Sequence, residues 1–174
     1  MFRKEYAILV EESPQVVWAF ISILPVSLTC HRAGRGFQWR DDPAPKVGSR
    51  YLLEQNLLGF TLRHEGRITR WNPPHSFALV HWTPKRPRWG FGHQQRLGVQ
   101  AVDGSPQVSE LRSIIIGSMG PWYVEAPFQA LVRRNMLDHL QALKRAIEST
   151  DKGGSPGREA APQLAVEVPT AGVG

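Results

Sequence analysis

The chain has 174 residues, 41% of them hydrophobic, which is enough for one domain with a substantial core, and no apolar run approaches the ~20 residues that a membrane span needs. Its net charge of +6 at pH 7 brings nucleic acid into consideration, but the basic residues are scattered and no nucleic-acid motif accompanies them, so we expect no nucleic-acid partner. Cys30 is the single cysteine, which excludes an internal disulfide, and the first residues lack the apolar core of a signal peptide, so we expect a cytoplasmic protein without stable membrane insertion.

The first part of the chain reads as a strand followed by two short helices. Residues 2–11 alternate between apolar and polar side chains, as in a strand with one buried face. Ser13 can cap a helix whose first turn holds Pro14, because proline lacks only an N–H that would have no helical partner there. Pro25 is expected to end this helix, and a second short helix is expected over residues 26–31.

Six further strands are expected between residues 37 and 116. Each is an alternating or apolar run, and clusters of Gly, Pro, Asn and Asp separate one run from the next. Because such short turns join antiparallel neighbours, the runs predict a meander in one curved sheet. Their ranges are 37–39, 49–56, 60–71, 77–82, 89–102 and 108–116.

A long amphipathic helix is expected from Val124 to Glu148. Its apolar residues recur in steps of three and four, the repeat of one helix face. Pro127 fits a first helical turn, so the helix is expected to begin between Tyr123 and Pro127. A stripe of this length needs an extended apolar partner, which a curved sheet can supply.

We expect one domain over residues 1–149 and a tail over residues 150–174. The tail contains no aromatic residue and is dominated by Gly, Pro and Ala. It cannot bury enough apolar surface to offset the entropy cost of ordering, so we expect it to be disordered and to carry no function.

Four segments, in this order, carry a resemblance to a known superfamily. Residues 13–18 combine a Ser-Pro helix entry with a Val-Val-Trp sequence, and residues 47–51 are a strand led by glycine. Residues 67–77 are a strand, a Pro-Pro turn and a second strand, and residues 137–148 are the last turns of the long helix. Together they resemble the START/Bet v 1-like helix-grip superfamily over about residues 2–149.

The resemblance implies an α+β fold of the helix-grip type. In it, a curved antiparallel sheet of about seven strands wraps around the long C-terminal helix, and two short helices follow the first strand. It also implies an internal cavity between sheet and helix that holds a lipid-like or polycyclic molecule. Within the superfamily the chain is similar to the group of polyketide cyclases, dehydratases and lipid transport proteins. The functions of that group are mixed, and no catalytic signature can be carried over residue by residue.

Three histidines are predicted to share the inner face of neighbouring strands. His64, His81 and His93 each fall on the mainly apolar face that is expected to point toward the long helix. If the Pro-Pro turn closes the first hairpin, His81 lies near Gly66, with His64 one diagonal away. If the next Pro-rich turn closes the second hairpin, His81 lies opposite Phe91, with His93 one diagonal away.

Three interpretations of these histidines stay open. They can be core or rim residues whose ring nitrogens are hydrogen-bonded to neighbours. One or two can be acid/base groups in a ligand cavity, because imidazole titrates near neutrality, and His64, His81 and His93 are then the catalytic candidates. A three-histidine metal site is the third interpretation. Diagonal neighbours lie ~7–8 Å apart and no carboxylate supports such a site, so we expect no metal.

Other side chains on the sheet face or on the helix stripe are predicted to contact the ligand. Aromatic rings can wall a flat apolar molecule, and amides can bind its polar groups. These candidates are Trp39, Tyr51, Gln55, Leu62, Leu79, Trp89, Phe91, Gln95, Phe128, Val132, Asn135 and Met136. His139 is a further polar candidate beside the stripe. The helix is expected to face the cavity over residues 128–136 and to pack as plain core over residues 140–147.

The inward face of the last strand is open to two interpretations. Odd-numbered residues from Ser109 to Ile115 share one face, and even-numbered residues from Val108 to Ile114 share the other. We favour the serine face pointing inward, which leaves Arg112 outside. A slip of one residue in the pairing would exchange the two faces.

Two main functions follow from these expectations. The first is a polyketide cyclase or dehydratase-like enzyme of natural-product biosynthesis, in which the cavity folds a reactive apolar substrate and a histidine moves a proton. The second is non-catalytic binding or transport of a lipid or isoprenoid. A protein-binding regulatory domain of the same fold is a third reading, and it predicts a filled interior with an apolar surface patch. No nucleotide, flavin or heme motif is present, so we expect no cofactor, and we expect a monomer or a homodimer.

Overall fold

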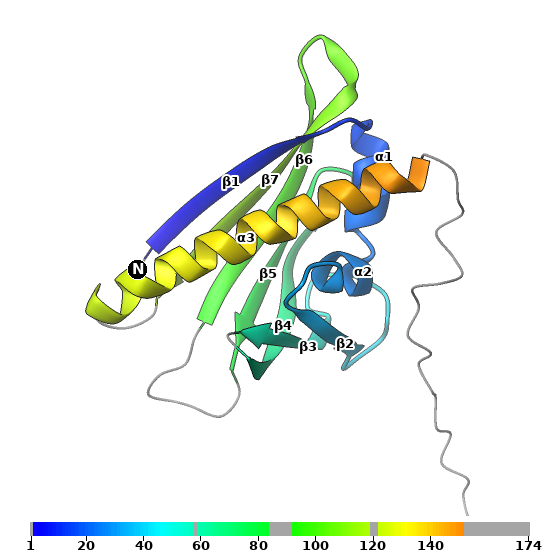
Figure 1. Ribbon diagram of the computed structural model, residues 1–174. Helices are drawn as coiled ribbons and strands as arrows, with labels where there is room; N and C mark the ends of the chain where they lie inside the picture. The colour runs from blue at the N-terminus through cyan, green and yellow to red at the C-terminus, as the bar shows by residue number, and fades with distance from the viewer. Residues whose placement is uncertain (1, 58, 84–91, 119–121, 152–174) are drawn as a thin grey trace, which may run out of the picture.

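The structure is a computed structural model that describes residues 2–57, 59–83, 92–118 and 122–151. Within these ranges the order is one strand, two short helices, six strands and one long helix, as the sequence predicts (Figure 1). The elements are β1 (Phe2–Val10), α1 (Pro14–Ile21), α2 (Leu24–Thr29), β2 (Gly34–Trp39), β3 (Arg50–Leu57), β4 (Phe60–Asn72), β5 (Ser76–Trp82), β6 (Gly92–Val102), β7 (Ser105–Ser118) and α3 (Trp122–Asp151).

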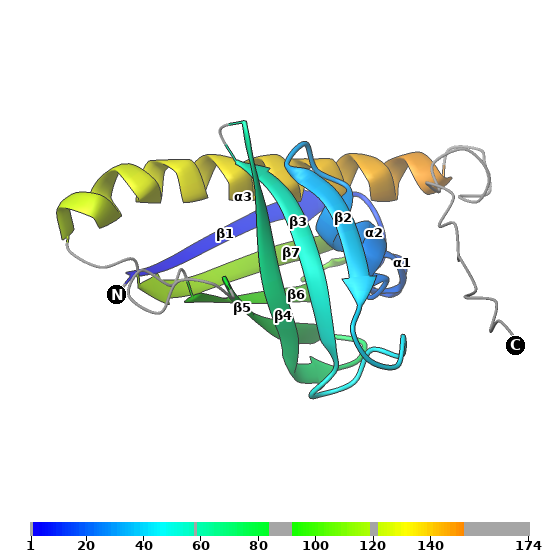
Figure 2. The same cartoon turned by 90° about the horizontal axis from the view of Figure 1, so that it is seen from below.

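The strands form one antiparallel sheet in the order β1-β7-β6-β5-β4-β3-β2. The chain enters at one edge with β1, crosses to the other edge with β2, and returns strand by strand to β7 beside β1. The sheet is strongly curved and α3 lies across its concave face, while α1 and α2 lie near the C-terminal half of α3 (Figures 1 and 2). The predicted α+β fold, a curved sheet around a long C-terminal helix, is confirmed.

Serine and proline set the starts of the two short helices. Ser13 caps α1, because its Oγ accepts a hydrogen bond from the Val16 N–H at 3.5 Å, and Pro14 is the first helical residue. The second helix begins two residues earlier than expected, at Leu24, and contains Pro25 in its first turn. Proline is tolerated there because the first N–H groups of a helix have no helical partner. Pro25 therefore belongs to the first turn of α2, and the prediction that it ends α1 is wrong.

Several strands are longer than side-chain alternation predicts. β2 begins at Gly34, which lies against α2 so closely that a Cβ would come within 2.6 Å of the Thr29 carbonyl oxygen. β7 begins at Ser105, directly after the turn at Gly104, whose φ of 76° favours glycine. Glycine carries no side chain and so gives no alternation signal, although its backbone can still pair in the sheet. The expected turn over residues 84–88 lies outside the described residues.

Helix α3 begins and ends slightly beyond its predicted range. It starts at Trp122, so Pro127 is its sixth residue and lies outside the first turn, where the helix loses one backbone hydrogen bond to it. Leu140, Leu143 and Ile147 are buried among apolar side chains of the core, which confirms the expectation for this half of the helix. No helix in the described ranges is long and apolar enough to cross a membrane. Beyond residue 151 the expected tail lies outside the described residues and stays a prediction.

The inward face of β7 is the one that carries its serines. The odd-numbered residues from Ser109 to Ile115 are buried. Arg112 points outward, where its guanidinium pairs with Glu5 at 2.9 Å and with Glu110. The favoured phase of the last strand is therefore confirmed.

Candidate functional site

A cavity of about 330 Å³ lies between the concave face of the sheet, α2 and the N-terminal half of α3. Apolar side chains form most of its wall, among them Leu53 of β3 and Val132 of α3. Phe60 at the β3–β4 turn lines the cavity although the residue is 72% exposed, so we take this end of the cavity as its mouth. The volume and the apolar wall are those of a small-molecule site.

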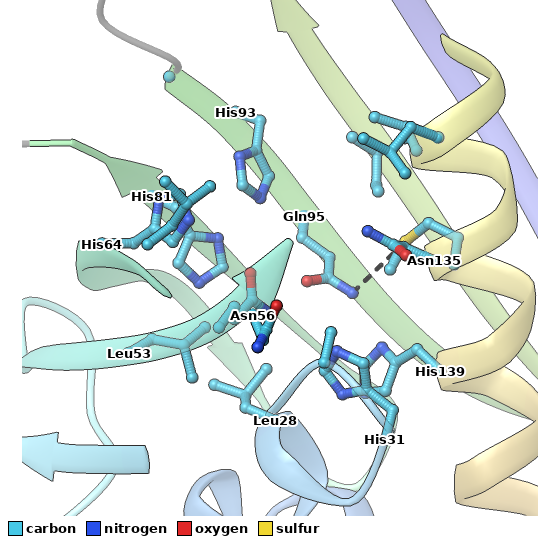
Figure 3. A pocket seen from close by; sticks show the side chains of 18 of the residues that line it. Leu28, His31, Leu53, Asn56, His64, His81, His93, Gln95, Asn135 and His139 are labelled. Atoms are coloured by element: carbon cyan, nitrogen blue, oxygen red, sulfur yellow. Dashed lines mark hydrogen bonds between the residues drawn. The ribbon is translucent and has the colours of Figure 1, made fainter. Parts of the chain in front are cut away.

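Five of the six histidines of the chain line this cavity, in two groups. The first group, the sheet histidines, comes from β4, β5 and β6 and consists of His64, His81 and His93. The second group, the helix histidines, comes from the segment after α2 and from α3 and consists of His31 and His139. Figure 3 shows Gln95 between the two groups. The sixth histidine, His75, is exposed in the β4–β5 turn.

The sheet histidines lie closer together than predicted. His81 pairs with Gly66 on β4, as expected, but on β6 it pairs with His93 and not with Phe91. A register shift of two residues keeps the same face inward, and it brings the two imidazoles directly opposite each other. Their ring centroids are 4.7 Å apart, and those of His64 and His93 are 6.3 Å apart. The prediction of a shared face is confirmed, and that of a diagonal placement for His93 is wrong.

The imidazole of His81 is hydrogen-bonded to the phenol of Tyr51. Tyr51 Oη and His81 Nε2 are 2.7 Å apart, and both side chains are buried. The bond passes over Gly66, where a Cβ would overlap the Tyr51 ring. Because phenol is the stronger acid and imidazole the stronger base, Tyr51 donates, and neutral His81 then carries its proton on Nδ1. Tyr51 therefore positions His81 and does not line the cavity, unlike its predicted role as a ligand contact.

Burial keeps the sheet histidines neutral. It lowers the pKa of His81 well below the ordinary value, and the nearby His93 and His64 lower this pKa further, because neighbouring imidazolium charges repel. Burial also lowers the pKa of His93 to about 4, with a smaller contribution from His64, and it lowers the pKa of His64 itself. At neutral pH these rings are uncharged, and each offers one N–H donor and one acceptor nitrogen.

The helix histidines form a second neutral pair. His139 Nε2 lies 2.7 Å from the backbone carbonyl oxygen of Ser27 in α2, and the centroid of the His31 ring is 4.6 Å from that of His139. Burial, and then the proximity of His139, lower the pKa of His31 to about 3, and burial lowers the pKa of His139. In the part of the chain that the structure describes, no group of three or more His, Cys, Asp or Glu side chains could hold a metal ion.

Four buried side-chain atoms have no hydrogen-bond partner among the described residues. They are Nδ1 of His31, His64 and His81 and Oγ1 of Thr83. Leaving such an atom unpaired costs about 1–3 kcal/mol, so buried polar atoms in proteins are normally satisfied. Three of the four belong to histidines that line the cavity. The arrangement therefore suits a bound molecule that is apolar in its body and carries hydrogen-bonding groups.

Gln95 is a further polar group of the cavity with weak partners. Its Nε2 lies 3.5 Å from Ser113 Oγ and 3.9 Å from Met136 Sδ, the contact drawn as a dashed line in Figure 3. The first distance is long for a hydrogen bond, and a thioether is a weak acceptor. Gln95 can exchange both contacts for a stronger one to a ligand.

Some of the predicted ligand contacts line the cavity and others do not. Those that line the cavity are Gln55, Leu62, Gln95, Val132, Asn135 and Met136. Trp39 and Leu79 do not line it, because they lie toward the other end of the sheet, where Leu79 is fully buried and Trp39 packs against Tyr51. Trp89, Phe91 and the side chain of Phe128 lie outside the described residues.

The α2 side of the cavity was missed by the sequence analysis. Leu28 and His31 line it, as does Asn56 from β3. A six-residue helix is too short for its periodicity to show which face points inward, so no sequence signal distinguished Leu28 or His31. Cys30 beside them is half-buried, and burial raises the pKa of its thiol to about 11, which makes it a poor nucleophile.

No protein-family model matches the sequence, and a search of curated proteins found no match. The fold, however, is found in solved structures. The Zhui aromatase/cyclase from a Streptomyces species superposes with a TM-score of 0.69 at 14% identity, over 88% of this chain and 99% of that chain. Ara h 8.0201 superposes with a TM-score of 0.62 at 12% identity, over 85% of this chain and 98% of that chain.

A protein from Thermus thermophilus superposes with a TM-score of 0.68 at 10% identity, over 86% of this chain and 99% of that chain. The TM-scores establish a shared fold, but identities this low leave function to be argued from the site. The chain therefore has the Bet v 1-like helix-grip fold, and its resemblance to the START/Bet v 1-like superfamily is confirmed at the level of the fold.

Proposed function

We propose that the protein binds a hydrophobic or polycyclic small molecule in this cavity and acts on it as a cofactor-free cyclase or dehydratase of the polyketide type. The observation that carries the proposal is the group of neutral sheet histidines that line an apolar cavity, two of which have a buried Nδ1 without a hydrogen-bond partner among the described residues. Structural histidines are normally hydrogen-bonded, so these atoms favour contact with a bound molecule. The 330 Å³ cavity also counts against the filled interior of a protein-binding regulatory domain.

His81 and His93 take complementary parts in the proposed reaction. His81 donates its Nδ1–H to a carbonyl oxygen of the substrate, while His93 removes a proton from the carbon beside that carbonyl. The resulting enolate attacks a second carbonyl of the same folded molecule, and the His93 imidazolium returns the proton to the new alkoxide. In the dehydration, His93 removes the second proton of that carbon and gives it to the departing hydroxide, which leaves as water.

The low pKa that burial gives His93 suits both proton transfers, the removal of a proton from carbon and its return to oxygen. A pKa of about 4 keeps the ring unprotonated and ready to accept a proton at neutral pH. The same low pKa makes the imidazolium a strong acid, which favours return of the proton to oxygen. The weak basicity restricts the substrate to acidic carbons, such as those flanked by two carbonyl groups.

The test uses two cavity variants and one matched control. His81→Gln and His93→Gln change the proposed acid/base groups, and His75→Gln changes the exposed histidine of the β4–β5 turn. Conversion of a linear poly-β-ketone thioester analogue, followed by mass spectrometry, should fall by about 10²–10⁴-fold in the first two variants and stay unchanged in the control. Binding of anthraquinone, a polycyclic probe, should persist in all three. Unchanged product formation by His81→Gln would refute the catalytic assignment.

A non-catalytic carrier of a lipid or isoprenoid is the second candidate function. The exposed Phe60 at the cavity mouth favours it, because an apolar side chain there can contact a ligand during entry. Native mass spectrometry after mild purification separates the two functions. A co-purified intact lipid, together with no conversion of the poly-β-ketone analogue, would favour the carrier.

A further inference from the structure

The helix histidines face the cavity but take no part in the proposed reaction. His31 is 7% exposed and His139 is 2% exposed, and both line the same cavity as the sheet histidines. Figure 3 shows them on the other side of Gln95 from the sheet histidines. A molecule that contacts the sheet histidines with one end can therefore present its other end to His31 and His139.

The hydrogen-bonding capacity of this pair is set by α2. The Ser27 carbonyl oxygen can only accept, so His139 Nε2 carries the proton of the neutral ring, and His139 Nδ1 is left as an acceptor. His31 Nδ1 is buried and has no partner among the described residues. Because the ring centroids are 4.6 Å apart, the two rings can contact one small group together.

We infer that His31 and His139 form a binding subsite for a hydroxyl group, whether phenolic, enolic or alcoholic, at the end of the ligand remote from the sheet histidines. The inference rests on the proposed binding function, because it concerns a ligand in the same cavity. A hydroxyl donates and accepts through one oxygen, so it can donate to His139 Nδ1 and accept from His31 Nδ1–H. A ketone can only accept, so it would leave His139 Nδ1 unpaired, and an ammonium would bring a charge into a mainly apolar cavity.

A carboxylate fits this subsite less well than a hydroxyl. It accepts but does not donate, and its charge would have to be buried in a mainly apolar cavity. No Lys or Arg is among the described residues that line the cavity, so no fixed positive charge is at hand. The subsite should therefore prefer neutral hydroxyl compounds to carboxylic acids of the same ring system.

The test compares naphthalene, a naphthol and a naphthoic acid, each titrated by its own fluorescence at about pH 7. The wild-type protein should bind the naphthol roughly 10-fold more tightly than naphthalene, which is in the lower part of the gain expected of two hydrogen bonds. The naphthoic acid should bind more weakly than the naphthol. If naphthalene itself does not bind, the proposed function fails together with this inference. If naphthalene binds and the naphthol gains nothing, only the hydroxyl subsite is refuted.

Two phenylalanine variants locate the hydroxyl. His31→Phe keeps a ring of similar shape and removes the unpartnered nitrogen, so the preference for the naphthol should fall to about 3-fold, the share of the remaining hydrogen bond to His139, while naphthalene binding persists. His64→Phe makes the same change among the sheet histidines and should leave the preference intact. The opposite result, with the preference lost only in His64→Phe, would overturn the inference. His31→Asn, whose amide can both donate and accept, should retain part of the preference, and it serves as the readout if His31→Phe does not fold.

Discussion

The strands and the long helix each pass from a filled end of the molecule to a hollow end. On β5, Phe77 and Leu79 are fully buried in the core, whereas His81 lines the cavity. On α3 the change runs the other way along the chain, because Met136 lines the cavity and Leu140, one turn later, belongs to the core. The inward faces of the sheet and of α3 therefore pack as core at one end of the molecule and line the cavity at the other end.

The difference between the two ends is what lies between sheet and helix. At the filled end, α1 and α2 insert Val17, Ile21 and Leu24 into the core. Toward the hollow end only the last part of α2 reaches the cavity, with Leu28. The comparison teaches that the two short helices fill only part of the space that the sheet encloses. Stability is expected to come from the filled end and ligand binding from the hollow end.

The largest expected effect is a truncation at the filled end. Leu143→Ala should lower the free energy of unfolding by about 2–5 kcal/mol, because it removes a fully buried side chain and leaves a cavity in packed core. Val132→Ala, on the same helix but at the half-buried wall of the cavity, should cost less than about 1 kcal/mol, since few contacts are lost there. Urea unfolding of both variants measures the difference. Equal losses would contradict the division into two ends.

The next largest effect concerns the hydrogen bond between Tyr51, in the core, and His81, one of the sheet histidines. Tyr51→Phe should lower the free energy of unfolding by about 1–3 kcal/mol, because His81 Nε2 would remain buried without its partner. Nitrogen NMR should also show that His81 loses its fixed tautomer, a change that loss of packing alone does not predict. Tyr6→Phe is the matched control, since Tyr6 is only half-buried on β1, and it should cost less than about 0.5 kcal/mol. An unchanged His81 spectrum in Tyr51→Phe would rule out the positioning role.

A smaller effect is a decrease in the free energy of unfolding on acidification, which comes from the buried neutral histidines. The pKa of His31 is about 3 in the folded protein and 6.5 ordinarily, so below pH 6.5 the unfolded chain binds a proton that the folded protein does not. The stabilisation is complete above pH 6.5 and decreases as the pH falls toward the folded pKa. His31 alone contributes about 1.4 kcal/mol of lost stability per pH unit in that window.

Urea unfolding between about pH 7 and about pH 5 measures the free energy of unfolding of the wild type and of variants that lack one histidine. His31→Phe should lose less stability on acidification than the wild type, by about 1.4 kcal/mol per pH unit. His75→Gln, which changes an exposed ring, should follow the wild-type curve. If His31→Phe follows it as well, burial does not keep His31 neutral.

The sequence predicts the fold and the inward face better than the boundary of the cavity. Alternation on β4, β5 and β6 identified the shared face of the sheet histidines, because a period of two residues is independent of register shifts by two. It could not place His93 opposite His81, since that depends on how the chain between β5 and β6 closes. Periodicity likewise could not separate Leu79, in the core, from Leu62, at the cavity, because both occupy the inward face.

Contacts between distant parts of the chain account for what the sequence could not predict. The Tyr51–His81 bond joins residues thirty positions apart and depends on a glycine on the strand between them. His31 follows α2, and the Ser27 carbonyl of that helix is hydrogen-bonded to His139 of α3, which also lines the cavity. Neither placement follows from local pattern, since each requires the final packing of helix on sheet.

The smallest expected effect on stability is at the mouth of the hollow end. Phe60→Ser should change the free energy of unfolding by less than about 0.5 kcal/mol, because the residue is 72% exposed and contributes little packing. Phe60 nevertheless lines the cavity, so its removal should weaken the apolar contact that retains a ligand and speed dissociation of anthraquinone by several-fold. Stopped-flow fluorescence measures the dissociation rate. Val47→Ser, at another exposed apolar residue away from the cavity, is the control and should leave the rate unchanged. An unchanged rate in Phe60→Ser would mean that the ligand leaves by a different route, and the mouth would then have to be placed elsewhere on the cavity wall.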